Sequence, residues 1–315
     1  MLTTLARQEL SGISGGRVRF DEPLRLHTSF RIGGPAEAWV EPQDIEELNT
    51  VLSFAQAADV PVTMIGGGAN LLVRDAGIPG VVVSLSALVF RRLTRDGTAV
   101  TVGAGVGLDR IVAMTRDAGL GGCEFLTGIP GKLGGAVCMN AGTRDGEGGF
   151  RAMSDVVTWV TVLRRTGAMS VLSAADVGFQ YRCSGLNGDV ILEATLQLIP
   201  RPSEEIARNI AALMAYKRAT QDLSAPSAGC IFKNPRGGPT HLPDEHPSAG
   251  WLIDRAGLKG LRVGNAMVSP RHANFIVNLG SAKASDVLAL ISAIQYKVLQ
   301  EHGLFLDLEV QVLPA

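Results

Sequence analysis

Hydrophobic residues recur along the chain at spacings that predict both strands and helices. Within residues 190–199, Leu192, Ala194, Leu196 and Leu198 alternate with Glu193, Thr195 and Gln197. Because successive side chains of a strand point to opposite faces of a sheet, this alternation predicts a strand with one buried face. Residues 156–163 form a second β-branched run, so we expect a sheet-rich region from Gly103 to about Ile199.

The segment before this region predicts a small α/β unit. AEAWVEP (36–42) is typical of a strand, DIEELNTVLSFAQAADV (44–60) of a helix, and PVTMIGGG (61–68) of a second strand.

The segment after it predicts a further unit that begins at Pro200–Arg201–Pro202. Ser203, followed by two glutamates, is a favourable helix start, with Ile206, Ile210, Leu213 and Met214 on one apolar face. Helices are also expected over 248–256 and 285–301, with a strand at NFIVN (274–278) between them.

The closing segment, 304–313, again alternates and predicts a final strand. One face would carry Leu304, Leu306, Leu308, Val310 and Val312, and the other Phe305, Asp307, Glu309 and Gln311.

Length and composition indicate a folded protein of two or three domains. The chain has 315 residues, of which 46% are hydrophobic and 19% charged. Its 29 basic and 30 acidic side chains leave a formal charge of −1, which provides no positive field for nucleic acid. The longest apolar stretch, near 81–90, is shorter than the roughly 20 residues of a membrane span, and the first residues do not resemble a secretory signal. We therefore expect a cytoplasmic protein without nucleic-acid or membrane partners, and we make no prediction of oligomeric state.

Neither the cysteines nor the histidines have the spacing of a metal site. Cys123, Cys138, Cys183 and Cys230 include no C-x-x-C pair, and we expect most of them to be buried as small apolar side chains. His241 and His246 lie five apart in a Pro-rich segment, which does not place two ligands on one helix face. We expect no metal.

Three glycine clusters could approach a phosphate: GGGAN (66–70), GAGVG (103–107) and GIPGKLGG (128–135). Glycine allows backbone N–H groups to approach an anion closely, although each cluster alone is more typical of a tight turn than of a phosphate site. The first two clusters lack the last glycine of G-x-G-x-x-G. Leu133 follows Lys132 where a Walker loop needs Ser or Thr, so both standard nucleotide motifs are excluded.

Eight segments in order resemble those of the UDP-N-acetylenolpyruvoylglucosamine reductase (UDP-N-acetylmuramate dehydrogenase) family. They are HTSFRIGGPAEAWV, GGGANLLVRD, GIPGKLGGAVCMNAG, FQYRCS, PSAGCIFKNP, AGWLIDRAGLKG, VSPRHANFIVN and LDLEV, and they cover the chain from His27 to Val310. The length resembles the shorter class of this family.

The resemblance implies an α+β fold with an FAD-binding region of the vanillyl-alcohol oxidase type. We expect FAD-binding subdomains at 1–85 and 86–202, a substrate-binding domain at 203–302, and a strand within 303–315 that returns to the first subdomain. FAD would bind noncovalently. The residues expected to hold it are Gly66, Gly67, Gly68, Ala69, Asn70, Leu71, Gly131, Gly134 and Gly135.

The family reaction implies that NADPH reduces FAD, and that the flavin then delivers hydride to C3 of the enolpyruvyl ether of UDP-N-acetylenolpyruvoylglucosamine. The product is UDP-N-acetylmuramate, a precursor of peptidoglycan. The developing enolate needs a cation and C2 needs an acid. Arg182 matches the family arginine for the substrate carboxylate, which Tyr181 would position, and Glu309 matches the glutamate near the reacting carbon.

Cys230 departs from the serine that most relatives use as proton donor in this segment. A thiol has an ordinary pKa of about 8.5, so it should donate a proton as well. The alternative is a buried, inert thiol.

The resemblance also assigns contacts to the nucleotide of the substrate. They are Lys233 and Asn234, with Lys217 and Arg218 offering charge to the diphosphate. Thr220, Gln221 and Asp222 depart from the basic residue and Gln-Pro of many relatives, so which cation binds the diphosphate stays open.

The sequence leaves two other functions open. One is another FAD-dependent oxidoreductase of the same fold that acts on a small alcohol or hydroxy acid. The other is an inert module that binds a UDP-sugar or flavin. The first would not need the PSAGCIFKNP segment and Glu309, and the second would not need Arg182 and Glu309.

Overall fold

A computed structural model describes residues 1–144, 149–186, 188–235 and 248–314. The chain forms two compact units, each of which is discontinuous in sequence. Unit 1 comprises residues 1–22, 37–67 and 79–217, and unit 2 comprises residues 23–36, 68–78 and 218–315. Each unit has its own core of buried apolar side chains.

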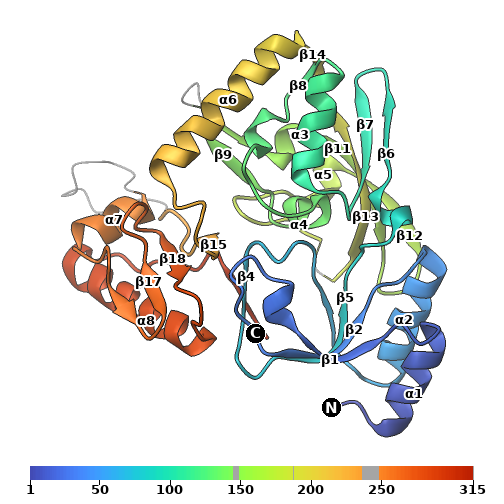
Figure 1. Ribbon diagram of the computed structural model, residues 1–315. Coiled ribbons are helices and arrows are strands. Elements are labelled where there is room, and N and C mark those ends of the chain that lie inside the picture. The colour runs from blue at the N-terminus through green and yellow to red at the C-terminus, as the bar shows by residue number, and fades with distance from the viewer. Residues whose placement is uncertain (145–148, 187, 236–247, 315) are drawn as a thin grey trace. The chain divides into compact units, whose positions relative to one another are not determined.

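The largest sheet of unit 1 is antiparallel, in the order β12-β11-β13-β7-β6 (Figure 1). Its strands are β6 (Leu93–Asp96), β7 (Ala99–Gly103), β11 (Val157–Leu163), β12 (Met169–Ser173) and β13 (Val190–Gln197). In β13 the alternation predicted from the sequence is confirmed, because Ala194 and Leu196 are buried whereas Gln197 is exposed.

A four-stranded sheet, most of which belongs to unit 1, has the order β1-β2-β5-β3. Its strands are β1 (Arg19–Pro23), β2 (Pro35–Val40), β3 (Val62–Met64) and β5 (Ile78–Val83). The helices α1 (Thr4–Ile13) and α2 (Ile45–Ala57) pack against each other. The predicted strand–helix–strand order of residues 36–68 is therefore confirmed.

Shorter elements complete unit 1. They are α3 (Leu108–Asp117), β8 (Leu120–Gly121), α4 (Leu133–Cys138), β9 (Gly142–Arg144), β10 (Phe150–Ala152), α5 (Ala174–Val177), β14 (Ile199–Pro200) and α6 (Ser203–Thr220). β9 pairs with β10 and β8 with β14, and the boundary between the units falls near the end of α6.

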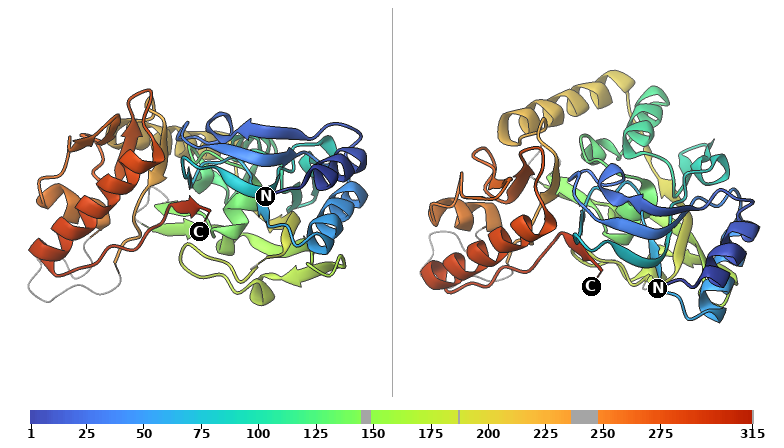
Figure 2. Two further views of the ribbon diagram at one scale, coloured as in Figure 1. Left: turned by 90° about the horizontal axis from the view of Figure 1, so that it is seen from below. Right: turned by 60° about the horizontal axis from the view of Figure 1, so that its bottom comes forward.

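Unit 2 is built on an antiparallel sheet in the order β15-β18-β17-β16. Its elements are β15 (Ser227–Cys230), α7 (Ala249–Arg255), β16 (Arg262–Val263), β17 (Ala266–Val268), β18 (Phe275–Asn278) and α8 (Ala284–His302). α8 runs alongside this sheet and contacts α7 (Figure 2). The predicted helices and the intervening strand are confirmed, with Ser248 as the N-cap of α7.

The closing segment is less regular than predicted. Its alternation of burial is present, since Leu306 and Val310 are buried whereas Phe305 and Asp307 are exposed. The strand itself, β19, covers only Gln311–Leu313, and it pairs in parallel with β4 (Leu71–Val73). The prediction of one strand over 304–313 was wrong because residues 307–310 bond instead to the backbone around Ile231.

The expectation that most cysteines are buried was also wrong. Cys123 is buried, and burial raises the pKa of its thiol to about 12. Cys138 is the last residue of the short helix α4 and is exposed. Cys183 is also exposed, and Cys230 is half-buried.

Candidate active site

Residues of all three glycine clusters meet within unit 1, to which Gly66 and Gly67 of the first cluster belong. A Cβ on Gly67 would lie 2.7 Å from the Cα of Gly131, so these two backbones approach as closely as glycine allows. The cluster GAGVG (103–107) joins them through two backbone hydrogen bonds. Leu133 donates its N–H to Val106 at 2.9 Å, and Gly134 donates to Ala104 at 3.0 Å.

Five consecutive backbone N–H groups, from Gly66 to Asn70, donate no hydrogen bond to any residue that the structure describes. Successive backbone donors of this kind suit the oxygen atoms of a diphosphate. Next to them, a Cβ on Gly135 would meet no heavy atom within 4 Å, and a Cβ on Gly66 would lie 3.9 Å from the Gly135 nitrogen. The loops predicted to hold FAD therefore offer backbone donors and open space, which fit that cofactor.

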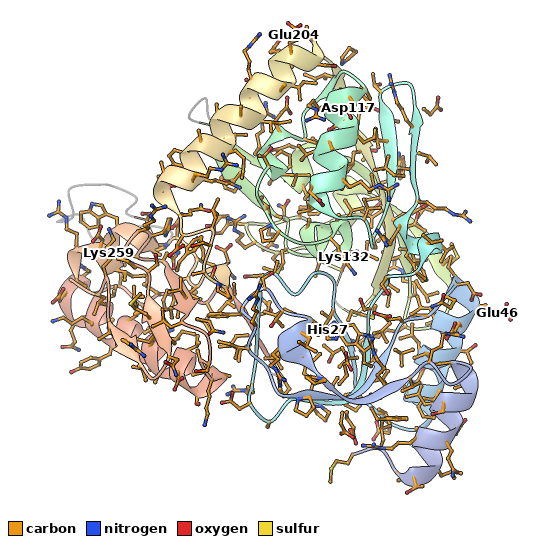
Figure 3. All side chains as sticks on the ribbon, viewed as in Figure 1. His27, Glu46, Asp117, Lys132, Glu204 and Lys259 are labelled. Atoms are coloured by element: carbon orange, nitrogen blue, oxygen red, sulfur yellow. The ribbon has the colours of Figure 1, made fainter. Side chains whose placement is uncertain are left out.

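Lys132 was not predicted as a site residue, although it lies where the glycine clusters meet. It is the N-cap residue of α4 (Figure 3), and it forms an isolated β-bridge with Gly107. Burial lowers the pKa of its ammonium group, with Glu41 opposing the shift and Arg91 adding to it. The sequence signal for Lys132 is the Gly131-Lys132 pair, which also occurs in Walker loops but here is followed by Leu133.

Arg182 occupies the tip of a short hairpin in unit 1. Gln180 and Cys183 exchange backbone hydrogen bonds of 2.9 and 3.2 Å, which leaves Tyr181 and Arg182 at the turn. Arg182 has a φ of 57°, in the left-handed region that a non-glycine residue rarely adopts. Its Nη1 donates to the Gly142 carbonyl at 2.7 Å, and its guanidinium lies 5.4 Å from the Tyr181 ring centroid. The predicted pair thus forms one local structure.

Cys230 and Glu309 both lie in unit 2, on segments whose backbones are hydrogen bonded. The N–H of Glu309 donates at 2.8 Å to the carbonyl of Ile231, which is the residue directly after Cys230 in the chain. The carbonyl of Glu309 accepts from the Asn70 side chain at 2.9 Å. One predicted flavin-loop residue is therefore bonded to the predicted catalytic glutamate.

The residues predicted to bind the nucleotide have different surroundings. Lys217 is buried in unit 1 and donates its Nζ to the Thr127 carbonyl, whereas the next residue, Arg218, is exposed. Lys233 donates its backbone N–H to Asp307 at 2.8 Å, and the Asn234 carboxamide accepts from Ala249 at 3.0 Å. The nucleotide-binding roles of all four stay predictions.

The described part of the chain contains neither a membrane-spanning helix nor a cluster of metal ligands. No helix there combines the length and hydropathy needed to cross a bilayer. No group of three or more His, Cys, Asp or Glu side chains there could hold a metal ion, and His241 and His246 lie outside the described residues.

Comparison with known proteins identifies the family. Residues 36–173 match the model of an FAD binding domain, and residues 221–313 match the C-terminal domain of UDP-N-acetylenolpyruvoylglucosamine reductase. A relative in Symbiobacterium thermophilum, named UDP-N-acetylenolpyruvoylglucosamine reductase 2, is 42% identical, with 94% of this chain and 92% of that protein covered. One in Bacillus velezensis, named as the same reductase, is 39% identical over 97% of each chain.

A solved structure gives the same result. The crystal structure of UDP-N-acetylenolpyruvylglucosamine reductase from Thermus caldophilus is 40% identical to this chain, with a TM-score of 0.77. The match covers 95% of this chain and 98% of that one. The chain therefore belongs to the UDP-N-acetylenolpyruvoylglucosamine reductase family, with its α+β, FAD-binding fold.

Proposed function

We propose that this protein reduces UDP-N-acetylenolpyruvoylglucosamine to UDP-N-acetylmuramate with NADPH, using bound FAD. The observation that carries the proposal is the match, over more than nine-tenths of both chains, to relatives that bear the reductase name. The protein is an FAD-containing oxidoreductase of peptidoglycan precursor synthesis. Because the UDP-sugar and NADPH are cytoplasmic metabolites, the proposal includes action in the cytoplasm.

FAD would be held noncovalently by the loops at 66–71 and 131–135. When bound, it supplies the redox chemistry, by taking hydride from NADPH and passing it to C3 of the substrate. The support for these contacts is the run of unused backbone donors from Gly66 to Asn70 and the open backbone at Gly135. Lys132, half-buried beside these glycines, would contribute positive charge near the diphosphate.

Arg182 would bind the enolpyruvyl carboxylate and stabilise the negative charge that develops on it. A guanidinium suits this role because it stays charged and presents two parallel N–H donors. Its support by the Gly142 carbonyl and the Tyr181 ring fixes its direction before substrate arrives. Such preorganisation is the main source of electrostatic stabilisation of a transition state.

Cys230 would donate the proton to C2, and Glu309 would assist that protonation. The support is their common attachment to Ile231, because Cys230 precedes it in the chain and Glu309 donates to its carbonyl. A donor held on a hydrogen-bonded strand end keeps its distance to the reacting carbon, as general acid catalysis requires.

Lys233 and Asn234 would contact the nucleotide, and Arg218 would be the cation for the diphosphate. Arg218 is favoured over Lys217 because the latter is buried and its ammonium group already donates to Thr127. Exposed Arg218 keeps its guanidinium in contact with solvent, where a diphosphate can reach it.

Absorbance under anaerobic conditions tests the proposal. The purified protein should be yellow, lose its flavin absorbance on addition of NADPH, and regain it on addition of UDP-N-acetylenolpyruvoylglucosamine. Mass spectrometry should then find a product heavier than the substrate by two hydrogen atoms. A protein that stays colourless after incubation with FAD, or a reduced flavin that the UDP-sugar leaves unchanged, would contradict the proposal.

A further inference from the structure

In the segment GIPGKLGGAVCMNAG (128–142), the residues assigned to FAD end at Gly135. The last three residues of the segment are Asn140, Ala141 and Gly142, which follow α4. Asn140 is buried, with only 7% of its surface exposed, and has a φ of 41°. A buried carboxamide in a left-handed conformation needs specific partners, because burying unpaired polar atoms is costly.

Both ends of the Asn140 side chain are hydrogen bonded to backbone. Its Oδ1 accepts from the N–H of Ser154 at 2.9 Å, and its Nδ2 donates to the carbonyl of Gln180 at 3.0 Å. Gln180 is the first residue of the hairpin that carries Arg182. The carboxamide therefore fixes the base of that hairpin.

Gly142 holds the arginine at the tip of the same hairpin. Its carbonyl accepts the hydrogen bond from Arg182 Nη1 at 2.7 Å. A Cβ on Gly142 would lie 2.9 Å from the Cα of Ala152 and closer still to the Arg151 carbonyl, so only glycine lets β9 approach β10 this closely. Residues 140 and 142 thus bond to the first and the third residue of the hairpin.

We propose that Asn140 is a positioning residue that holds Arg182 in place for the carboxylate of the substrate. The proposal rests on the role of Arg182 given under Proposed function. A hairpin with one backbone hydrogen-bonded pair would let its tip tilt, and the bond to Asn140 Nδ2 prevents this tilt. A displacement of about 1 Å in a group that contacts the substrate can slow a reaction about 100-fold.

The placement of Asn140 also connects two parts of the site. Gly134 and Gly135 lie in the first turn of α4, and Asn140 follows the end of that helix. The same short helix therefore carries flavin-loop residues at one end and the hydrogen bond to the arginine hairpin just beyond the other.

Two variants of Asn140 test the proposal. Asn140→Asp keeps the acceptor for Ser154 but places an oxygen against the Gln180 carbonyl, and Asn140→Gly removes the carboxamide while tolerating the positive φ. Asn278 provides the matched control. It is 4% exposed, its Nδ2 donates to the Phe30 carbonyl at 3.0 Å, and its Oδ1 accepts from Gly280 at 2.8 Å.

Rapid-mixing absorbance should then separate the two half-reactions in FAD-loaded protein. In both Asn140 variants, reduction by NADPH should keep its rate, reoxidation by the UDP-sugar should slow about 10-fold to 100-fold, and the Kd of the UDP-sugar should rise. Asn278→Asp and Asn278→Gly should lower thermal stability without this split. Equal slowing of both half-reactions, the same split in the Asn278 variants, or wild-type behaviour of the Asn140 variants would overturn the proposal.

Arg182→Ala, measured in parallel, distinguishes this proposal from the one on which it rests. If Arg182→Ala reoxidises normally, the assigned role of Arg182 is wrong and the inference on Asn140 falls with it. If Arg182→Ala is slow and both Asn140 variants are normal, the inference on Asn140 alone is wrong. In the double variant Arg182→Ala with Asn140→Asp, reoxidation should be no slower than in Arg182→Ala.

Discussion

Glu309 donates its backbone N–H to the carbonyl oxygen of Ile231 at 2.8 Å, which attaches it to the residue directly after Cys230. The same carbonyl accepts a longer bond of 3.3 Å from Val310. On the other side, Ile231 donates its own N–H to Asn274 at 2.9 Å. The main chains of the two residues assigned to protonation are thus joined through the hydrogen-bonded backbone of Ile231, which fixes the spacing of their backbones.

Gly135→Val should weaken FAD binding without unfolding the protein. A side chain there would occupy open space beside the Gly66 loop. It would push the diphosphate of FAD away from the backbone donors, and because charge-assisted hydrogen bonds would be lost, we expect the Kd for FAD to rise at least about 10-fold. Flavin fluorescence during titration of the apoprotein measures this. Gly12→Val is the control, since a Cβ on Gly12 in α1 also meets nothing within 4 Å. Unchanged FAD affinity in folded Gly135→Val would remove Gly135 from the site.

Gly68→Val is a poorer test of the same site. A Cβ on Gly68 would collide with the His27 carbonyl and lie 2.8 Å from the Cα of Thr28, and its φ is +61°. The substitution should therefore destabilise unit 2 whether or not FAD is near.

Arg182→Ala should act on the second half-reaction alone. NADPH should still bleach the flavin at the wild-type rate, while reoxidation by the UDP-sugar should slow by about 10²-fold to 10³-fold, the usual loss for one preorganised electrostatic contact. Stopped-flow absorbance follows both steps. Arg262→Ala is a suitable control because Arg262 is exposed on β16 and donates hydrogen bonds to the nearby residues Gly264 and Asn265. A normal rate of reoxidation would exclude Arg182 from the mechanism.

Cys230→Ala should reduce turnover by about 10²-fold to 10⁴-fold, the range for loss of a general acid. Reduction of the flavin by NADPH should survive, because that step needs no thiol. Cys230→Ser should retain substantial activity, since a hydroxyl can also transfer a proton. Cys123→Ala, which removes a fully buried thiol, should affect stability rather than either half-reaction. If Cys230→Ala forms product at the wild-type rate, the thiol is structural.

Asp75→Asn should remove a pH-dependent part of the stability. The Asp75 carboxylate accepts from the N–H groups of Ala284 at 2.8 Å and Ser285 at 3.0 Å, at the start of α8. Burial opposes ionisation, but these bonds and Lys283 outweigh it and hold the pKa of Asp75 below its usual value. A lowered pKa in the folded state stabilises the protein above the unfolded-state pKa, and the stabilisation is lost as the pH falls through the folded-state pKa.

Urea unfolding at several pH values measures the effect. At pH 7 the variant should be less stable by about 1 kcal/mol, the usual contribution of a capping side chain. The difference should shrink as the pH falls below the ordinary carboxyl pKa of about 3.9, and it should vanish once the pH lies below the lowered folded-state pKa of Asp75, where both proteins carry a neutral side chain at this position. Asp117→Asn, at an exposed ion pair with Arg116, serves as the control. A difference that persists at low pH would show that shape rather than charge is responsible.

Periodicity predicted the regular elements because it reports directly which face of an element is buried. The alternation in β13 and the apolar face that contains Ile206 and Leu213 in α6 are examples. The resemblance supplied the residues Arg182, Cys230 and Glu309, none of which any periodic pattern singles out.

The features that were missed depend on contacts between residues distant in sequence. The bond from Asn140 to Gln180 spans 40 residues, and Asp75 accepts from Ala284 across 209 residues. A single polar side chain that bonds to remote backbone leaves no repeat in the sequence. The shortness of β19 has the same origin, because the preceding residues find partners around Ile231 rather than in a strand of their own sheet.

The pairing of β19 with β4 has a consequence for biosynthesis. Asn70 and Glu309, which this pairing region joins, are separated by 239 positions, so a long stretch of chain is synthesised between them. A nascent chain carries the loop that follows Gly66 long before its hydrogen-bonding partner exists. We therefore expect the cofactor loop to acquire its final form only after Gln311–Leu313 have been synthesised, which makes FAD capture a late event relative to the synthesis of the loop itself.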